Sequence, residues 1–273
     1  MPPEETIRSR TNPLFRRLRA LKERGTERET CLIEGPKLVL DALAAGVALI
    51  EAGASARAET TLAGAAALAA LEGAGVPVRR VAPDLLRSLS EAETSQGIVA
   101  LARRPSFDES SLFREVPLVL VAHAVQNPGN LGALLRTAEA AGATGAFLTV
   151  GSADPLSWKA LRGSMGSAFR LPHVCGLPLE EALDRLAARG VLVMATAADG
   201  ERTYDEADLR GPVAILVGTE GQGLPPAVLR RAAARLRIPL RPPVESLNVG
   251  VAAALVLFEA ARQRSHDEGR PGQ

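Results

Sequence analysis

The sequence is short of aromatic residues, of cysteine and of net charge. Aromatic residues make up 3% of its 273 residues, so any core must be built from alanine, leucine and valine. The two cysteines, Cys31 and Cys175, lie in different halves and form no disulfide framework, which favours a reduced, cytoplasmic compartment. The N-terminus is polar and no apolar run is long enough to cross a bilayer, so we expect neither a signal segment nor a membrane span.

Metal-ligand patterns and catalytic triads are missing as well. His123, His173 and His266 show no metal-ligand spacing with each other or with the cysteines, so we expect no metal site. No Ser-His-Asp or Cys-His arrangement is indicated by order or context. His123 follows an apolar run, where an ordinary strand-end histidine is more common than one that contacts RNA. The single tryptophan, Trp158, is best explained as a core residue.

Positive charge is concentrated locally, although the whole chain carries only +1. Eight basic residues stand between positions 8 and 28 against two glutamates, and five arginines without an acid stand between 228 and 241. A third acid-free stretch holds Lys159, Arg162 and Arg170. One such cluster would be explained as a solvated helix face, but three favour contact with the phosphates of RNA.

The length fits two domains of ordinary size. The first part alternates short apolar strands with helices, which predicts a small α/β sandwich at 1–105 that binds an RNA substrate. Its expected strands are 30–34, 47–52, 76–81 and 97–102, and its expected helices are 12–24, 37–45, 62–71 and a short one after Pro83. A stretch with serines and mixed charge at 106–116 is the expected linker.

The second part, 117–266, also alternates strands and helices, and 267–273 is expected to be a disordered tail. Its strands are almost continuous apolar runs, as found when helices cover both faces of a sheet. We therefore expect a doubly wound, mostly parallel sheet. The expected strands are 118–122, 146–150, 191–196, 213–217 and 236–240, and the expected helices are 131–141, 158–167, 179–189, 226–234 and 247–264.

Three polar motifs follow three of these strands directly. Asn127–Gly132, with Arg136 beyond it, comes after 118–122. Gly218–Leu224 comes after 213–217, and Glu245–Val249 comes after 236–240. Ligands of such sheets bind beyond the carboxyl ends of the strands. The three motifs therefore predict one common site.

Each motif also has a purely structural explanation. The glycines of 218–223 have neither P-loop nor dinucleotide spacing and would equally serve a flexible turn, in which Glu220 is either idle or placed for use. Gly129 and Asn130 can cap a helix. Arg136 has apolar neighbours, so it either extends to solvent or is held for chemistry.

Together and in this order, the motifs resemble the signature of the SpoU/TrmH branch of the SPOUT RNA methyltransferases. Arg162–Ser167 resembles the Arg-x-Ser-x-Gly element of the same family. In the first domain, Leu32–Lys37 and Ser95–Val99 resemble the accessory substrate-binding domain of members that act on ribosomal RNA. The resemblance therefore spans nearly the whole chain.

The resemblance implies a deep trefoil knot, a homodimer with its sites at the subunit interface, and methyl transfer to a ribose 2′-hydroxyl. Arg136 would stabilise the developing alkoxide and grip the target phosphate, because a guanidinium is a poor base. The residues that would orient the nucleotide and Arg136 are Asn130, Glu220, Ser246 and Asn248. The residues that would hold the donor, S-adenosylmethionine, are Thr196, Leu216, Gly218, Ile238 and Leu247, largely through backbone groups. The expected RNA-binding residues are Arg16, Arg17, Arg19, Lys37, Arg162 and Arg170.

The extra N-terminal domain favours 23S ribosomal RNA over transfer RNA as the substrate. Two other classes of protein stay open at this point. A non-catalytic RNA-binding or ribosome assembly factor would keep the fold without the chemistry. A nucleotide-dependent oxidoreductase would share the sheet topology, but the fingerprint glycines are missing.

Overall fold

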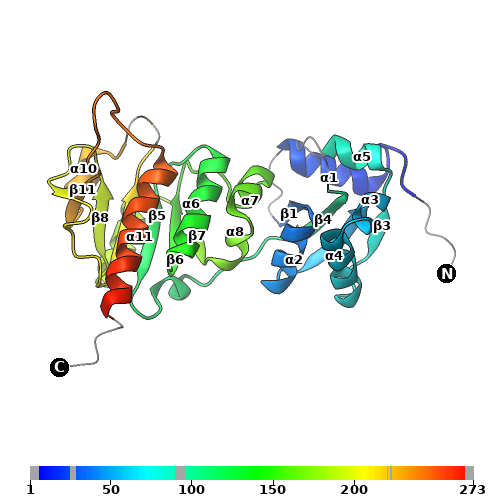
Figure 1. The fold of residues 1–273 in the computed structure, drawn as a ribbon, viewed down its shortest axis with the longest axis horizontal. Coiled ribbons are helices and arrows are strands. Elements are labelled where there is room, and N and C mark those ends of the chain that lie inside the picture. Colours follow the sequence, from blue (N-terminus) through cyan, green and yellow to red (C-terminus); the bar gives the residue numbers. More distant parts are fainter. Residues whose placement is uncertain (1–5, 25–28, 90–95, 220, 222, 268–273) are drawn as a thin grey trace. The chain divides into compact units, whose positions relative to one another are not determined.

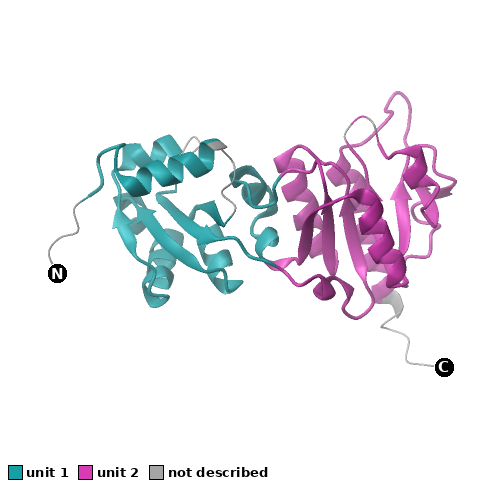
Figure 2. Cartoon of the chain, turned by 180° about the vertical axis from the view of Figure 1, so that it is seen from behind, with its two compact units in different colours: residues 1–106, 154–169 teal, residues 107–153, 170–273 magenta. Residues whose placement is uncertain are grey.

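The computed structural model describes residues 6–24, 29–89, 96–219, 221 and 223–267. The chain forms two compact units (Figure 2). Unit 1 consists of residues 1–106 and 154–169, and unit 2 of residues 107–153 and 170–273. The segment 154–169 thus packs with the N-terminal residues, although the sequence places it inside the second domain.

Unit 1 is built on a four-stranded mixed sheet (Figure 1). Its strands, in spatial order, are β1 (Thr30–Glu34), β4 (Ile98–Arg103), β2 (Leu49–Ala54) and β3 (Val78–Arg80). Strand β4 runs antiparallel to both of its neighbours, and β2 runs parallel to β3. Helices complete the α/β sandwich that the sequence predicts: α1 (Pro13–Arg24), α2 (Pro36–Ala44), α3 (Ala56–Glu59), α4 (Leu62–Gly73), α5 (Pro83–Leu89) and α7 (Trp158–Ser164).

Helix α1 shows how the local sequence gives this packing. The Asn12 side chain accepts a hydrogen bond of 3.0 Å from the backbone N–H of Leu14, and Pro13 stands in the first turn, where its missing N–H is not needed. The buried residues of α1 follow a helical spacing and pack against α5 and Trp158. They are Leu14, Phe15, Leu18 and Leu21.

Unit 2 is built on a seven-stranded sheet in which every pairing is parallel. The strands, in spatial order, are β7 (His173–Leu177), β6 (Gly145–Thr149), β5 (Leu118–Ala122), β10 (Val213–Val217), β8 (Leu192–Thr196), β11 (Ala234–Arg237) and β9 (Arg202–Thr203). Strand β10 lies between β5 and β8, so spatial order departs from chain order at the centre of the sheet.

Helices cover both faces of this sheet, which confirms the doubly wound fold. Helices α6 (Pro128–Ala140) and α11 (Val249–Asp267) lie side by side on one face (Figure 1). The other face packs on α9 (Leu179–Ala188), α10 (Pro226–Leu229) and the short 3₁₀ helix η1 (Glu109–Phe113). Because both faces are covered, every residue of β5 and β10 is buried.

The structure differs from the sequence-based expectation in several details, among them the following. Strands β7 and β9 were not expected, and the helix expected over 226–234 ends at Leu229, because residues from Ala234 onward pair with β8 instead. The helix expected over 158–167 breaks at Met165, whose φ of 48° is left-handed. The segment expected as a linker contains η1, and its Leu112 is fully buried in unit 2.

Candidate active site

The carboxyl ends of three neighbouring strands of unit 2 surround a cavity of about 710 Å³. Segments that follow β8, β10 and β11 line it, together with the first turn of α11. We call it the strand-end cavity. Its described lining residues are Thr196, Ala197, Ala198, Asp199, Gly218, Thr219, Gly221, Gly223, Leu224, Leu229, Leu236, Ile238, Leu240, Glu245, Ser246, Leu247, Asn248, Val249 and Ala252.

The loop after β10 is closed tightly by its own backbone. Thr219 and Gly223 exchange two backbone hydrogen bonds of 3.2 Å each. A Cβ on Gly218 would lie 2.5 Å from both the carbonyl carbon and the oxygen of Gly223, so any other residue here would force the loop to move. The glycines of this motif therefore shape the wall of the cavity. Glu220, for which we expect an orienting role, lies outside the described residues.

Four of the five residues expected to hold a donor line the strand-end cavity. They are Thr196, Gly218, Ile238 and Leu247. Leu216 is fully buried and is not among the described lining residues. Its carbonyl oxygen accepts a hydrogen bond of 3.2 Å from the Thr196 hydroxyl, which fixes the end of β8 against β10.

The first and third motifs meet through two asparagines that are 118 residues apart. Asn248 Nδ2 donates to Asn130 Oδ1 over 3.3 Å, which joins the start of α6 to the start of α11. Asn248 Oδ1 also accepts 2.9 Å from the backbone N–H of Gly250, so this residue caps α11. Ser246 is exposed and lines the cavity together with Asn248.

The cap of α6 is Asn127, so Gly129 and Asn130 are not explained by capping, contrary to the purely structural explanation of this motif. Asn127 Oδ1 accepts hydrogen bonds of 2.8 and 3.2 Å from the backbone N–H groups of Gly129 and Asn130. The Asn127 side chain thus satisfies two donors of the first turn. This leaves the Asn130 side chain to bond Asn248.

Arg136 lies on the exposed side of α6, about one and a half turns beyond Asn130. It forms no hydrogen bond or ion pair with any residue that the structure describes, and it is not among the described residues that line the strand-end cavity. Its neighbours Leu134, Leu135 and Ala138 are fully buried. The packing of α6 therefore fixes the backbone of Arg136 while its side chain stays accessible.

Comparisons with known proteins identify this arrangement. Residues 117–258 match the SpoU rRNA Methylase family, and residues 12–100 match the MRM3-like substrate binding domain. The chain belongs to the SpoU rRNA methylase family. The resemblance seen in the motifs is thereby confirmed.

Individual relatives differ in how much of the chain they match. The 23S rRNA (guanosine(2553)-2'-O)-methyltransferase RlmP of Bacillus subtilis is 36% identical over 89% of this chain and 93% of that protein. An AdoMet-bound rRNA methyltransferase from Sinorhizobium meliloti is 31% identical, with a TM-score of 0.82, over 94% of this chain and 97% of its own. A structure concerned with 2-OH methylation of C/U34 on tRNA is 34% identical, with a TM-score of 0.51, over only 57% of this chain and 96% of its own.

Two carboxylates at this site were given no role by the sequence motifs, although Glu245 begins the third of those motifs. Asp199 and Glu245 line the strand-end cavity. Asp199 precedes Gly200, where a Cβ would lie 2.6 Å from the backbone nitrogen of Arg237. The segment 197–200 follows a strand at its carboxyl end, so the criterion that found the other three motifs would have found this one too.

The basic residues expected to bind RNA are exposed, but several carry partners within the chain. Arg19 pairs with Glu23 at 2.6 Å and Lys37 with Asp41 at 3.3 Å, both in unit 1. In unit 2, Arg170 donates two hydrogen bonds of 2.6 and 2.8 Å to Glu139. The Arg162 guanidinium lies 5.2 Å from the centre of the Trp158 ring. Arg16 and Arg17 are exposed on α1.

Other ionisable groups of this SpoU protein point to structural roles. His123 Nδ1 lies 3.0 Å from the Thr149 hydroxyl, and burial lowers its pKa. Burial raises the pKa of the Cys31 thiol to about 12, which makes this thiol unreactive. Within the described residues, no group of His, Cys, Asp or Glu could hold a metal ion, and no helix is long and apolar enough to cross a membrane.

Proposed function

We propose that this protein transfers a methyl group from S-adenosylmethionine to a ribose 2′-hydroxyl of 23S ribosomal RNA. The observation that carries the proposal is the strand-end cavity of a SpoU methylase chain. The second and third motifs line this cavity, and the first motif is joined to the third by the hydrogen bond between Asn130 and Asn248. The reaction takes place in the cytoplasm, as the cysteine content favours.

The cavity suits this donor in size and in chemistry. Its volume of about 710 Å³ lies within the usual range for small-molecule sites, roughly 300–1,000 Å³. S-adenosylmethionine is a methyl donor with a positively charged sulfonium, and the carboxylates of Asp199 and Glu245 match that charge. Leucine, isoleucine and valine side chains supply an apolar wall for the adenine ring, and backbone groups at Thr196 and Gly218 supply polar contacts.

The chemistry is a direct displacement in which the ribose 2′-oxygen forms a bond to the methyl carbon and the carbon–sulfur bond breaks. The hydroxyl loses its proton to water as the new bond forms, and the donor leaves as S-adenosylhomocysteine. Arg136 stabilises the negative charge that develops on this oxygen, and it stays protonated throughout. Asn130, Ser246 and Asn248 orient the nucleotide, and Glu220 has the same role in this proposal.

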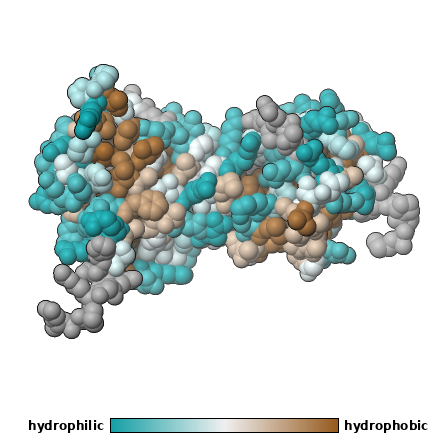
Figure 3. All heavy atoms as spheres, viewed as in Figure 1, coloured by the Kyte–Doolittle hydropathy of each residue, from teal (hydrophilic) through white to brown (hydrophobic). Residues whose placement is uncertain are grey.

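A second copy of the chain completes the site. Arg136 is exposed on α6 and is absent from the described lining of its own cavity. Beside it, α11 exposes an apolar stripe at helical spacing, formed by Val251 (49% exposed), Leu255 (37%) and Phe258 (50%). Figure 3 shows apolar surface over α11. A homodimer that covers this stripe brings Arg136 of one protomer towards the cavity of its partner.

Ribosomal RNA is favoured over transfer RNA by the extent of the similarity. The rRNA methyltransferases of Bacillus subtilis and Sinorhizobium meliloti named above match nearly the whole chain. Residues 12–100 of this chain also match a substrate binding domain. The tRNA-related protein matches little more than half of the chain. The deep trefoil knot that the resemblance implies also belongs to this proposal.

Methyl transfer from labelled S-adenosylmethionine to unmodified 23S ribosomal RNA and to transfer RNA tests the proposal. We expect one alkali-resistant, labelled nucleotide in the 23S RNA and a loss of about 100-fold or more in rate for Arg136→Ala. Because Arg136 is exposed, this variant should keep the thermal stability of the wild type. Donor binding without labelling of any RNA or ribosomal particle would favour the assembly-factor alternative, and label in transfer RNA alone would change the substrate.

A further inference from the structure

Arg136 is an exposed arginine whose own helix offers it a partner that it does not take. Glu139 stands three residues after Arg136 on α6, a spacing at which opposite charges on a helix surface meet. Arg136 nevertheless forms no hydrogen bond or ion pair with any residue that the structure describes. Something therefore keeps Glu139 away from it.

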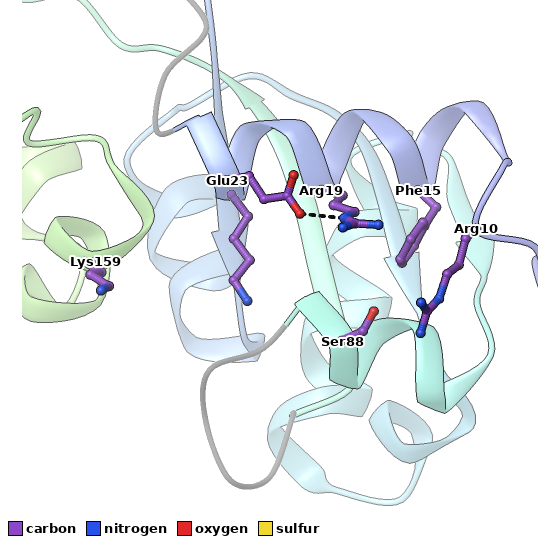
Figure 4. A pocket seen from close by; sticks show the side chains of 7 residues that line it. Arg10, Phe15, Arg19, Glu23, Ser88 and Lys159 are labelled. Atoms are coloured by element: carbon purple, nitrogen blue, oxygen red, sulfur yellow. Dashed lines mark hydrogen bonds and ion pairs between the residues drawn. The ribbon is translucent and has the colours of Figure 1, made fainter.

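The other described helices show what such a spacing gives in this chain. On α1, Glu23 accepts a hydrogen bond of 2.6 Å from Arg19, although both side chains are more than half exposed (Figure 4). On α11, Arg262 lies 2.7 Å from Glu259, three residues before it. Within the described helices, each basic residue with a described carboxylate three or four residues away pairs with it, apart from Arg136. These pairs are Arg19–Glu23, Lys37–Asp41, Asp84–Arg87, Glu181–Arg185 and Glu259–Arg262.

Glu139 is engaged by a different arginine. Arg170 is the last residue of the short helix α8 (Ser167–Arg170). Its Nε donates to Glu139 Oε1 over 2.6 Å, and its Nη2 donates to Glu139 Oε2 over 2.8 Å. Both residues belong to unit 2, and their side chains are 37% and 29% exposed. A bidentate pair of this kind is stronger than a pair along one exposed helix, so Glu139 stays with Arg170.

This arrangement matters because of what Arg136 does in the proposed reaction. A guanidinium stabilises the charge on the ribose oxygen only if its donors and its positive charge are available when that charge develops. A carboxylate paired with Arg136 would occupy its donors and cancel most of its charge. The carboxylate placed to do so is that of Glu139, and Arg170 binds both of its oxygens.

We propose that Arg170 is a positioning residue for methyl transfer, because by holding Glu139 it keeps the Arg136 guanidinium free for the substrate. The proposal rests on the proposed function, from which the role of Arg136 is taken. It also changes the role expected of Arg170, from a contact with RNA to a contact with Glu139.

The test uses three variants of the full chain: Arg170→Gln, Glu139→Gln and the double variant. In Arg170→Gln, the Glu139 carboxylate is left to pair with Arg136. In the other two, no carboxylate remains at position 139, so Arg136 is free whether Arg170 is present or not. Two quantities are measured for each protein: kcat/KM for methyl transfer to 23S ribosomal RNA, and the rate at which phenylglyoxal, an arginine reagent, modifies Arg136 in the absence of RNA. Thermal unfolding checks that each variant is folded.

We expect Arg170→Gln to lower the reactivity of Arg136 about twofold, because an ion pair at this helical spacing shifts an equilibrium by roughly that factor. Methyl transfer should fall by about 3- to 10-fold, since the bare carboxylate also repels the substrate phosphate. This deficit should shrink as salt rises from about 0.05 to 0.5 M, because the charges are partly exposed. Glu139→Gln and the double variant should keep rates within about twofold of the wild type.

The matched control removes an equivalent ion pair elsewhere in unit 2. Arg210 donates two hydrogen bonds of 2.9 and 3.0 Å to Asp208, and neither residue lies on α6 or lines the strand-end cavity. Arg210→Gln should leave methyl transfer and the reactivity of Arg136 at their wild-type values. If it slows methyl transfer as much as Arg170→Gln does, the loss has no specific connection with Arg136 and the proposal fails.

The three variants also separate the proposal from its alternatives. A double variant as slow as Arg170→Gln, beside a fast Glu139→Gln, would mean that Arg170 contacts RNA directly. Equal losses in both single variants would mean that the pair only fixes α8 against α6. Either result, or unchanged reactivity of Arg136 in Arg170→Gln, would overturn the proposal. If the wild type methylates no RNA while the reactivity of Arg136 falls in Arg170→Gln and recovers in the double variant, the proposed function fails and the control of Arg136 by Arg170 stands.

Discussion

Replacement of Gly218 by alanine probes the shape of the strand-end cavity with a single methyl group. The added Cβ would lie 2.5 Å from the backbone carbon and oxygen of Gly223 and 2.9 Å from the backbone nitrogen of Leu224. Ordinary contact begins near 3.4 Å, so the 218–224 loop must move by roughly 1 Å. A displacement of this size costs about 100-fold in the rate of a reaction that depends on positioning.

The same clash lowers stability, because overpacking costs about 1–3 kcal/mol. If that cost falls on the ligand-binding conformation of the loop, the affinity for S-adenosylmethionine drops by about 5- to 150-fold. We expect Gly218→Ala to stay folded, to bind the donor at least fivefold more weakly, and to turn over about 100-fold more slowly. Calorimetry, thermal unfolding and methyl transfer measure the three effects.

Gly211→Ala is the matched control. It lies in the same unit, shortly before β10, and a Cβ there meets no atom within 4 Å. This variant should resemble the wild type in all three measurements. A folded Gly218→Ala protein with wild-type affinity and rate would refute the argument that the tight closure of this loop shapes the donor site.

Three further predictions concern the dimer, the edge of the sheet and the asparagine pair. Phe258→Asp places a charge in the apolar stripe of α11, so the dimer should become a monomer in light scattering and methyl transfer should be abolished. A wild-type protein that is already a monomer would contradict the stripe as a dimer interface. Backbone and side-chain hydrogen bonds from Arg235 lower the pKa of Glu201 from 4.5 to about 2. The ionised carboxylate therefore stabilises the folded protein fully above about pH 4.5, and this stabilisation is lost as the pH falls through 2. The stability deficit of Glu201→Gln should therefore be full at pH 7 and shrink towards pH 2, and a pH-independent deficit would exclude this origin. Asn248→Ala removes the cap of α11 and should cost about 1 kcal/mol in urea unfolding, with non-additivity towards Asn130→Ala because the two side chains share a bond.

Much of the fold could be predicted because the central strands are simple in sequence. The bounds of β5 and β10 were predicted without error, since each is a continuous apolar run that a polar residue or a glycine ends. Strand β7 was missed because its middle is exposed and contains Gly176. The residues after Leu229 resemble a helix in composition, but pairing of Ala234 with Met194 on β8 overrides that local preference.

The sequence predicts only those features of the site that depend on the order of strands and motifs along the chain. The rule that ligands bind beyond strand ends grouped three motifs, of which the second and third line one cavity together with four of the five expected donor residues. The same rule cannot say which asparagine caps α6, because Asn127 and Asn130 are both suitable types. Nor can it show that residues 154–169 belong to unit 1.

The assignment of residues 154–169 to unit 1 has a consequence for taking the protein apart. Trp158 packs into the core of that unit and donates a hydrogen bond of 2.7 Å to Glu34, so the polypeptide passes between the two units three times. A fragment that stops at residue 105 would lack Trp158, which is part of its own core. A fragment that starts at residue 117 would carry Trp158 without the residues that it packs against. The units are therefore not consecutive segments of the chain, and a chimera that keeps both units intact needs three junctions instead of one.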